Sequence, residues 1–294
     1  MYDNFDFEII DSKKTSKGDA IVEVVTFPLL RGSDDPRTAE YLYFANEGGM
    51  KLKMVRIHLK DSSLRVEPGA LYHMCGQLEM VTSTGGGFFK GLSRKLTTGE
   101  SLLVNEIKGT GTIYLEPTFG HFLLHEIKEN DLGVICDKGM FFAGTTGLDI
   151  GAAVQKNISA GLMGGEGWFQ TKITGGGIAI LFSPVPVEEV QTVSLDNSKL
   201  SVDGNFALMR TDGIDFKAEK SSKSWLATSV SGEGMLQTFT GTGKVWIAPT
   251  QPTYDKMTSG EGFTIGAPGS MNNKTLDSKK KSKLPNINLN IGGK

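Results

Sequence analysis

The sequence predicts an all-β protein made of three pseudo-equivalent repeats, arranged as a three-sided β-prism or barrel. A Gly-x-Gly element recurs at a spacing of 66 residues, beginning at Gly109, Gly175 and Gly241. Glycine is abundant, with 38 among 294 residues, against an average of about 7%. Short β-branched and aromatic runs flank these glycines, as in strands that end in tight turns. A fixed period of this kind is typical of folds in which each unit buries its apolar face against the next.

The first 60 residues are expected to form strands that pack on the core and complete the first repeat. The strand-like stretches are Phe7–Ile10, Ala20–Phe27, Tyr41–Ala45 and Leu52–Leu59, with a turn segment at Arg31–Arg37. These stretches are rich in the β-branched and aromatic residues that favour strands.

The three repeats span about residues 61–117, 131–184 and 197–249. Each starts with a strand, a glycine turn and a second strand, and the turns lie at Gly69, Gly139 and Gly204. A β-hairpin is then predicted, because tight hairpin turns favour residues that tolerate positive φ. The hairpin turns are Gly109–Gly111, Gly175–Gly177 and Gly241–Gly243. A proline ends each hairpin, at positions 117, 184 and 249, because proline cannot donate to a strand ladder.

Residues 251–294 are expected to form a disordered basic tail. The segment is rich in Ser, Gly, Asn, Lys and Pro and poor in residues that build a core. Its charge cluster is Lys279–Lys281 together with Lys283. The cluster has two interpretations, a solvated tail or a weak contact with anionic lipid or polynucleotide.

Composition limits the location and the partners. The formal net charge of −2 makes nucleic acid an unexpected partner. There is no apolar run long enough to span a membrane, and the N-terminus does not resemble a signal peptide. The expectation is a cytoplasmic protein, with peripheral membrane contact as an extension. Cys75 and Cys136 both fall in predicted strands and are expected to be buried free thiols.

Four glycine-anchored motifs carry a resemblance to a known family: Val66–Leu71, Thr84–Arg94, Gly99–Ser101 and Gly164–Trp168. Over about residues 60–250 the chain resembles the mitochondrial biogenesis (altered inheritance of mitochondria) family, in its bacterial branch. The resemblance implies a fold of double-stranded β-helix type, like that of the trp RNA-binding attenuation protein. It supplies no catalytic residues. A fungal mitochondrial member is associated with inner-membrane organisation, which implies a scaffolding role by analogy.

The segment before the Gly-Glu of each repeat places bulky apolar residues among glycine, serine and basic residues. Such a composition is typical of membrane-interfacial or protein-binding surfaces. By symmetry the three segments are expected at one end of the prism, where the alternative is that they cap the barrel and join its core. The predicted surface comprises Phe88, Phe89, Lys90, Leu92, Arg94, Lys95, Leu162, Met163 and Trp225.

Glu100, Glu166 and Glu233 occupy the same position in their repeats. Three carboxylates around one axis would bind a hard cation, whereas each could instead accept backbone N–H bonds at the start of its hairpin. A histidine metal site is not predicted, since His121 and His125 fall in a strand and residues four apart along a strand are too distant to share an ion. No cofactor is expected.

The sequence therefore favours a non-enzymatic interaction or scaffold protein, with protein partners or self-association, that organises a membrane-associated complex through the apolar and basic loops. Two alternatives stay open. One is a small-ligand-binding protein or enzyme with a pocket in the β-barrel, and the other is RNA binding by analogy of fold.

Overall fold

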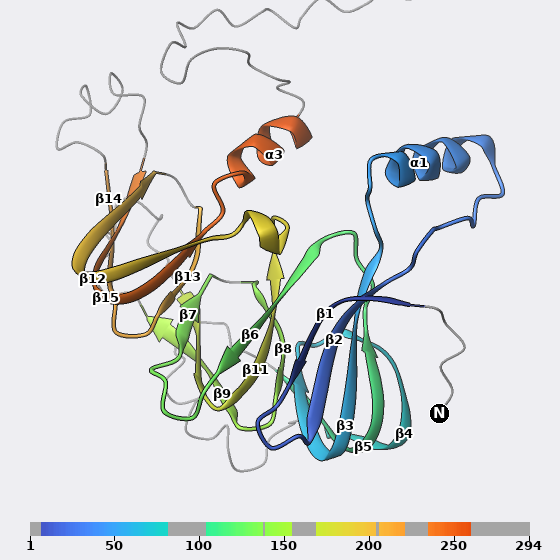
Figure 1. Cartoon of the computed structure of the whole chain (residues 1–294), viewed down its shortest axis with the longest axis horizontal. Helices are drawn as coiled ribbons and strands as arrows, with labels where there is room; N and C mark the ends of the chain where they lie inside the picture. Colours follow the sequence, from blue (N-terminus) through green and yellow to red (C-terminus); the bar gives the residue numbers. More distant parts are fainter. Residues whose placement is uncertain are drawn as a thin grey trace, which may run out of the picture. The chain divides into compact units, whose positions relative to one another are not determined.

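The computed structural model describes residues 7–81, 104–137, 139–154, 169–203, 206–220 and 235–259. The chain divides into two compact units, Met1–Asp255 and Lys256–Lys294. Within the described residues the protein is all-β, with two short α-helices, α1 (Pro36–Glu47) and α3 (Gln251–Thr258), and one 3₁₀ turn, η1 (Val187–Glu189) (Figure 1). No helix in this part of the chain has the length and apolar character needed to cross a membrane.

The first sheet has eight antiparallel strands. Its main path is β1 (Glu8–Lys14), β2 (Ala20–Thr26), β3 (Lys53–Val66), β8 (Phe141–Thr145), β11 (Gly177–Ser183) and β6 (His121–Ile127). A branch adds β5 (Asn105–Leu115), which pairs with β3, and β4 (Leu71–Val81), which pairs with β5. The two end strands, β1 and β6, also contact one another, so this sheet curls into a nearly closed barrel.

The second sheet has seven antiparallel strands. Its path is β12 (Gln191–Asp203), β15 (Met235–Ile247), β13 (Ala207–Thr211), β7 (Val134–Cys136), β10 (Phe169–Gly175) and β9 (Leu148–Val154), and β14 (Asp215–Lys220) pairs with β15. One core cluster lies within the first sheet and includes Ile57 and Ile113. A second cluster joins the two sheets, because it contains Ile173 of β10 and Leu181 of β11.

The predicted hairpins at the Gly-x-Gly elements are wrong. Gly109–Gly111 lies inside the continuous strand β5, and Gly241–Gly243 lies inside β15. At Gly175–Gly177 the chain leaves β10 for β11, but these strands belong to different sheets and do not pair with each other. The physical reason is that none of these elements closes a local turn. Two of them lie within strands whose partners are distant in the sequence, and the third connects strands of two different sheets.

A β-bulge lies opposite the glycine element in two of these strands. Leu59 of β3 pairs with Gly111 and Ser62 pairs with Gly109, so two residues of β3 lie opposite Thr110 alone. The bulge places Asp61 at a φ of 48°. The pairing of β12 with β15 shows the same shift, between Leu195 and Ser198, and there Asn197 has a φ of 42°. Extra residues of this kind increase the local twist of a strand.

Other predictions about single elements had mixed outcomes. The strands at Phe7–Ile10, Ala20–Phe27 and Leu52–Leu59 are confirmed in substance as β1, β2 and the first half of β3. Turns at Gly69 and Gly139 are confirmed, with φ of 86° and 83°, whereas Gly204 lies outside the described residues. The strand predicted at Tyr41–Ala45 is wrong, since these residues lie in α1. The disorder predicted from residue 251 is wrong for Gln251–Thr258, which form α3. The domain boundaries and the three-sided prism stay predictions.

Candidate functional site

All the site residues predicted from the sequence lie outside the described residues. They fall in segments 82–103, 155–168 and 221–234. The predicted interaction surface, namely Phe88, Phe89, Lys90, Leu92, Arg94, Lys95, Leu162, Met163 and Trp225, therefore stays a prediction. The same holds for the cation site of Glu100, Glu166 and Glu233.

Helix α1 provides the most distinctive surface in the described part of the chain. It begins at a strong N-cap, because Asp35 accepts hydrogen bonds from the backbone N–H of Arg37 at 2.9 Å and of Thr38 at 3.1 Å. Pro36, whose fixed φ suits a first helical turn, follows the cap. The helix ends in a glycine stop, where Gly49 has a φ of 71° and Met50 donates to the carbonyl of Ala45 at 2.8 Å.

The aromatic residues of α1 are exposed. Tyr41, Tyr43 and Phe44 keep 59%, 60% and 61% of their surface accessible, and none of the twelve residues of α1 is buried by the described part of the chain. Leu29 and Met50, on either side of the helix, are exposed as well. We call Leu29, Tyr41, Tyr43, Phe44 and Met50 the α1 surface. An exposed apolar cluster of this kind commonly marks a site of interaction.

The side chains of α1 are partly ordered by contacts within the helix. The Nε of Arg37 donates to the hydroxyl of Tyr41 at 3.0 Å, and its guanidinium lies 5.6 Å from the centre of the Tyr41 ring. The rings of Tyr43 and Phe44 meet edge to face at 5.5 Å. The aromatic groups are therefore held in position while they remain accessible, which lowers the entropy lost when a partner binds.

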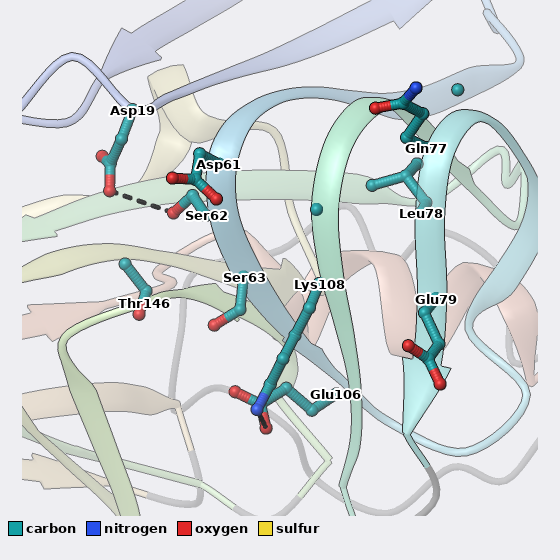
Figure 2. A pocket seen from close by; sticks show the side chains of 12 residues that line it. Asp19, Asp61, Ser62, Ser63, Gln77, Leu78, Glu79, Glu106, Lys108 and Thr146 are labelled. Atoms are coloured by element: carbon teal, nitrogen blue, oxygen red, sulfur yellow. Dashed lines mark hydrogen bonds and ion pairs between the residues drawn. The ribbon is translucent and has the colours of Figure 1, made fainter.

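An open groove of about 830 Å³ is lined by residues of β3, β4 and β5 together with Asp19 and Thr146, and Figure 2 shows the side chains around it. Its lining carries four carboxylates against the single ammonium of Lys108, and Lys108 is paired with Glu106 at 3.0 Å. The charged and polar residues around it include Asp19, Asp61, Ser62, Glu79, Glu106 and Lys108. This excess of carboxylates disfavours a phosphate-bearing ligand at the groove.

Asp19 at the edge of this groove is held as a carboxylate. Its side chain accepts hydrogen bonds from Ser62 at 3.0 Å and from Thr15 at 2.5 Å (Figure 2 draws the first). Burial acts to raise the pKa of Asp19, but these hydrogen bonds outweigh burial and lower it. Among the described residues, no three His, Cys, Asp or Glu side chains converge as a metal site would require.

A polar network lies in the second sheet and was missed from the sequence. Arg210 of β13 is buried and donates to Gln170 of β10 at 2.7 Å, and Gln170 donates to Asp137 at 2.8 Å. Arg210 also lies 5.0 Å from the ring of Phe216. Burial raises the pKa of Asp137 to about 6, and it lowers the pKa of Arg210 to about 10. The sequence did carry one signal for this network, namely the charged residue Arg210 placed between the apolar residues Ala207–Met209 and Thr211.

The cysteines and histidines carry no site in the described residues. Cys136 is buried as predicted, and burial raises the pKa of its thiol to about 12, so it is unreactive at neutral pH. The predicted burial of Cys75 is wrong, because Cys75 faces solvent on the outer strand β4. His121 and His125 lie in strand β6 as predicted, and His125 packs against Trp246 with ring centres 5.2 Å apart.

Comparisons with known proteins bear on the fold and the family. The crystal structure of protein SPYM3_0169 from Streptococcus pyogenes has a TM-score of 0.53 and 21% sequence identity, covering 71% of this chain and 94% of that one. This likeness concerns the fold alone. No curated protein matches the chain. The family model described as mitochondrial biogenesis AIM24 matches residues 44–250. The chain therefore belongs to the mitochondrial biogenesis AIM24 family.

Proposed function

We propose that this protein is a non-enzymatic interaction scaffold, in which a rigid β-structure presents binding surfaces to other macromolecules. The observation that carries the proposal is the α1 surface, where three aromatic side chains stand exposed on a helix capped at both ends. An exposed aromatic ring has a cost in water and a large gain on burial, since each ring can bury 150–250 Å². Aromatic residues are also enriched at the centres of protein interfaces.

The proposal includes a three-fold arrangement of the β-structure. Three backbone hydrogen bonds support this arrangement, because their donor residues lie 66 positions apart in the sequence. The N–H of Glu116 donates to the carbonyl of Ala70 at 2.8 Å, that of Phe182 to Met140 at 2.6 Å, and that of Ala248 to Phe206 at 2.8 Å. A repeated frame of this kind would present the segments 82–103, 155–168 and 221–234 at equivalent positions. The predicted interaction surface in these segments would then be a second contact area, directed at a membrane-associated complex.

A photo-reactive residue in the α1 surface tests the proposal. The native full-length chain would carry a photo-crosslinking amino acid at position 43, and the control would carry it at position 72, because Tyr72 is an exposed aromatic residue of β4. We expect adducts from position 43 that position 72 does not give. The identified partner, once purified, should bind the wild type and lose about tenfold in affinity for Phe44→Ser but not for Tyr72→Ser. Equal adducts from both positions, or equal affinities for both variants, would overturn the proposal.

The predicted interaction surface has its own test. Basic residues near an anionic membrane each contribute about 1 kcal/mol, and salt weakens that attraction. Co-sedimentation with vesicles containing phosphatidylserine should fall for Phe88→Ser/Phe89→Ser and at high salt. Binding that both changes leave intact would remove the membrane from the proposal and leave the α1 surface as its basis.

A further inference from the structure

We propose that the partner of the α1 surface is a second copy of this chain, bound through an antiparallel contact between the two α1 helices. This inference rests on the proposed function, since it names the occupant of the same surface. It starts from how the side chains are arranged on the helix. Arg37, Tyr41 and Phe44 are spaced i, i+4 and i+7, so they form one stripe. Glu40 and Glu47 border that stripe.

The charges of α1 are asymmetric along its axis. The basic residue Arg37 lies in the first turn, and the acidic residue Glu47 is the last residue of the helix. The aromatic residues lie between them. A helix of this pattern is self-complementary in only one direction. In a parallel pair, each Arg37 would face another Arg37 and each Glu47 another Glu47, and like charges at close range repel.

An antiparallel pair with a two-fold axis near Leu42 removes this conflict. It brings Arg37 of each copy opposite Glu47 of the other, which creates two equivalent ion pairs. The same axis brings Tyr41 of each copy beside Phe44 of the other, because both residues belong to the stripe. A two-fold contact of this kind uses one patch twice and closes on itself, so it gives a dimer and not a filament.

The expected dimer is weak. A contact between two 12-residue helices, even with Leu29 and Met50 at its margins, buries less than the roughly 1,200–2,000 Å² of a standard stable interface. The association should therefore depend on concentration in the micromolar range and on salt, because part of it comes from exposed ion pairs.

A charge-swap experiment on the full-length chain tests this geometry. Sedimentation velocity over a concentration series would compare the wild type with Arg37→Glu, with Glu47→Arg and with the double variant. Each single change suits the helix dipole, since it places an acidic residue in the first turn or a basic residue in the last. Arg37→Glu also removes the hydrogen bond from Arg37 to Tyr41, so weaker association of Glu47→Arg is the result that reports the ion pair itself. We expect each single variant to weaken association about tenfold and the double variant to restore it.

Further measurements make the proposal falsifiable. Phe44→Ser should abolish the dimer, and the control Tyr72→Ser should leave it intact. A wild type that stays monomeric at every concentration, or a double variant that associates no more strongly than the single variants, would overturn the proposal.

Vesicle binding that requires Phe44 in a monomeric protein would assign the surface to a membrane and also overturn the proposal. A crosslink from position 43 to residues 260–294 of the same chain, in a protein that stays monomeric, would assign the surface to the chain's own C-terminal segment and overturn the proposed dimer. A crosslink from position 43 to a different protein, without a dimer, would refute this inference while the proposed function stands.

Discussion

The hydroxyl of Thr110, halfway along β5, accepts a hydrogen bond from the backbone N–H of Asp61 at 2.9 Å. The same relationship occurs between Thr242 of β15 and Asn197 of β12, at 3.0 Å. In each case the donor is the bulge residue whose φ is positive, at 48° and 42°. The threonine therefore satisfies a backbone group that the bulge removes from the regular ladder.

We predict that Thr110→Val and Thr242→Val each lower the free energy of unfolding by about 0.5–1 kcal/mol, because valine keeps the shape but loses the acceptor. Urea titration of the full-length protein would measure this. The matched controls are Thr110→Ser and Thr242→Ser, which retain the hydroxyl. Equal stability of the valine and serine variants would show that the hydroxyls do not support the bulges.

Close approach of strands predicts a larger effect at Gly109. This residue has a φ of 127°, and an added Cβ would lie 2.0 Å from the carbonyl oxygen of Gln77. Gly111 has the same difficulty, with its Cβ 2.3 Å from the carbonyl oxygen of Cys75. We expect Gly109→Ala to cost on the order of 1–3 kcal/mol or more, since both the conformation and the space exclude a side chain.

Gly151 of β9 provides the comparison for Gly109. It also lies in a strand, but nothing is within 4 Å of its ideal Cβ. Gly151→Ala should change stability by less than about 0.5 kcal/mol. If thermal unfolding gave the same midpoint for both alanine variants, the close approach of the Gln77 carbonyl to Gly109 would be incorrect.

Sequence patterns predicted the strand-rich class and failed where pairing partners are remote. A glycine at positive φ serves a hairpin turn and a close approach of two paired strands equally well. At Gly109 the choice depends on Gln77, which lies 32 positions earlier and has no signal in the local sequence. The 66-residue spacing was therefore a sound observation whose local interpretation, a hairpin, was wrong.

Helix α1 was missed although its end signals are in the sequence. Asp35 and Pro36 form an N-terminal signal, and Gly48 and Gly49 form a stop. The aromatic run Tyr41–Phe44 has high strand propensity and dominated the prediction. The helix caps prevail here, and no strand among the described residues pairs with this run. The network of Asp137, Gln170 and Arg210 was unpredictable for another reason, since it joins three elements through spacings of 33 and 40 residues.

The C-terminal part of the chain gives a prediction about truncation. Tyr254 of α3 donates to a carboxylate oxygen of Glu189 at 2.8 Å, and Thr250 donates to the other oxygen. Removal of residues 260–294 should leave Tm unchanged, because the sequence there is poor in core-forming residues. Removal of residues 251–294 should lower Tm, because it also deletes Tyr254. An equal fall in Tm for both truncations, measured by differential scanning calorimetry, would mean that the last 35 residues contribute to the fold.

The raised pKa of Asp137 gives a prediction about pH. Burial raises this pKa from 3.8 to about 6, although the hydrogen bond from Gln170 and the charge of Arg210 both favour the carboxylate. Between these two pH values the folded state holds a proton that the unfolded state has released. Stability from this group is therefore complete below about pH 4 and is lost as pH rises to about 6. The difference between a pKa of 3.8 and one of about 6 corresponds to roughly 3 kcal/mol at most.

Asp137→Asn should remove this dependence, since an amide stays neutral at every pH and its oxygen can still accept from Gln170. The measurement is the free energy of unfolding in urea at pH 4, 5, 6 and 7.5 for the wild type and the variant. Other carboxylates titrate alike in both proteins and cancel in the difference. The variant should gain relative to the wild type as pH rises from 4 to 6, and the difference should then level off. A difference that stays constant over this range would mean that Asp137 is ionised throughout, held as a carboxylate by Arg210.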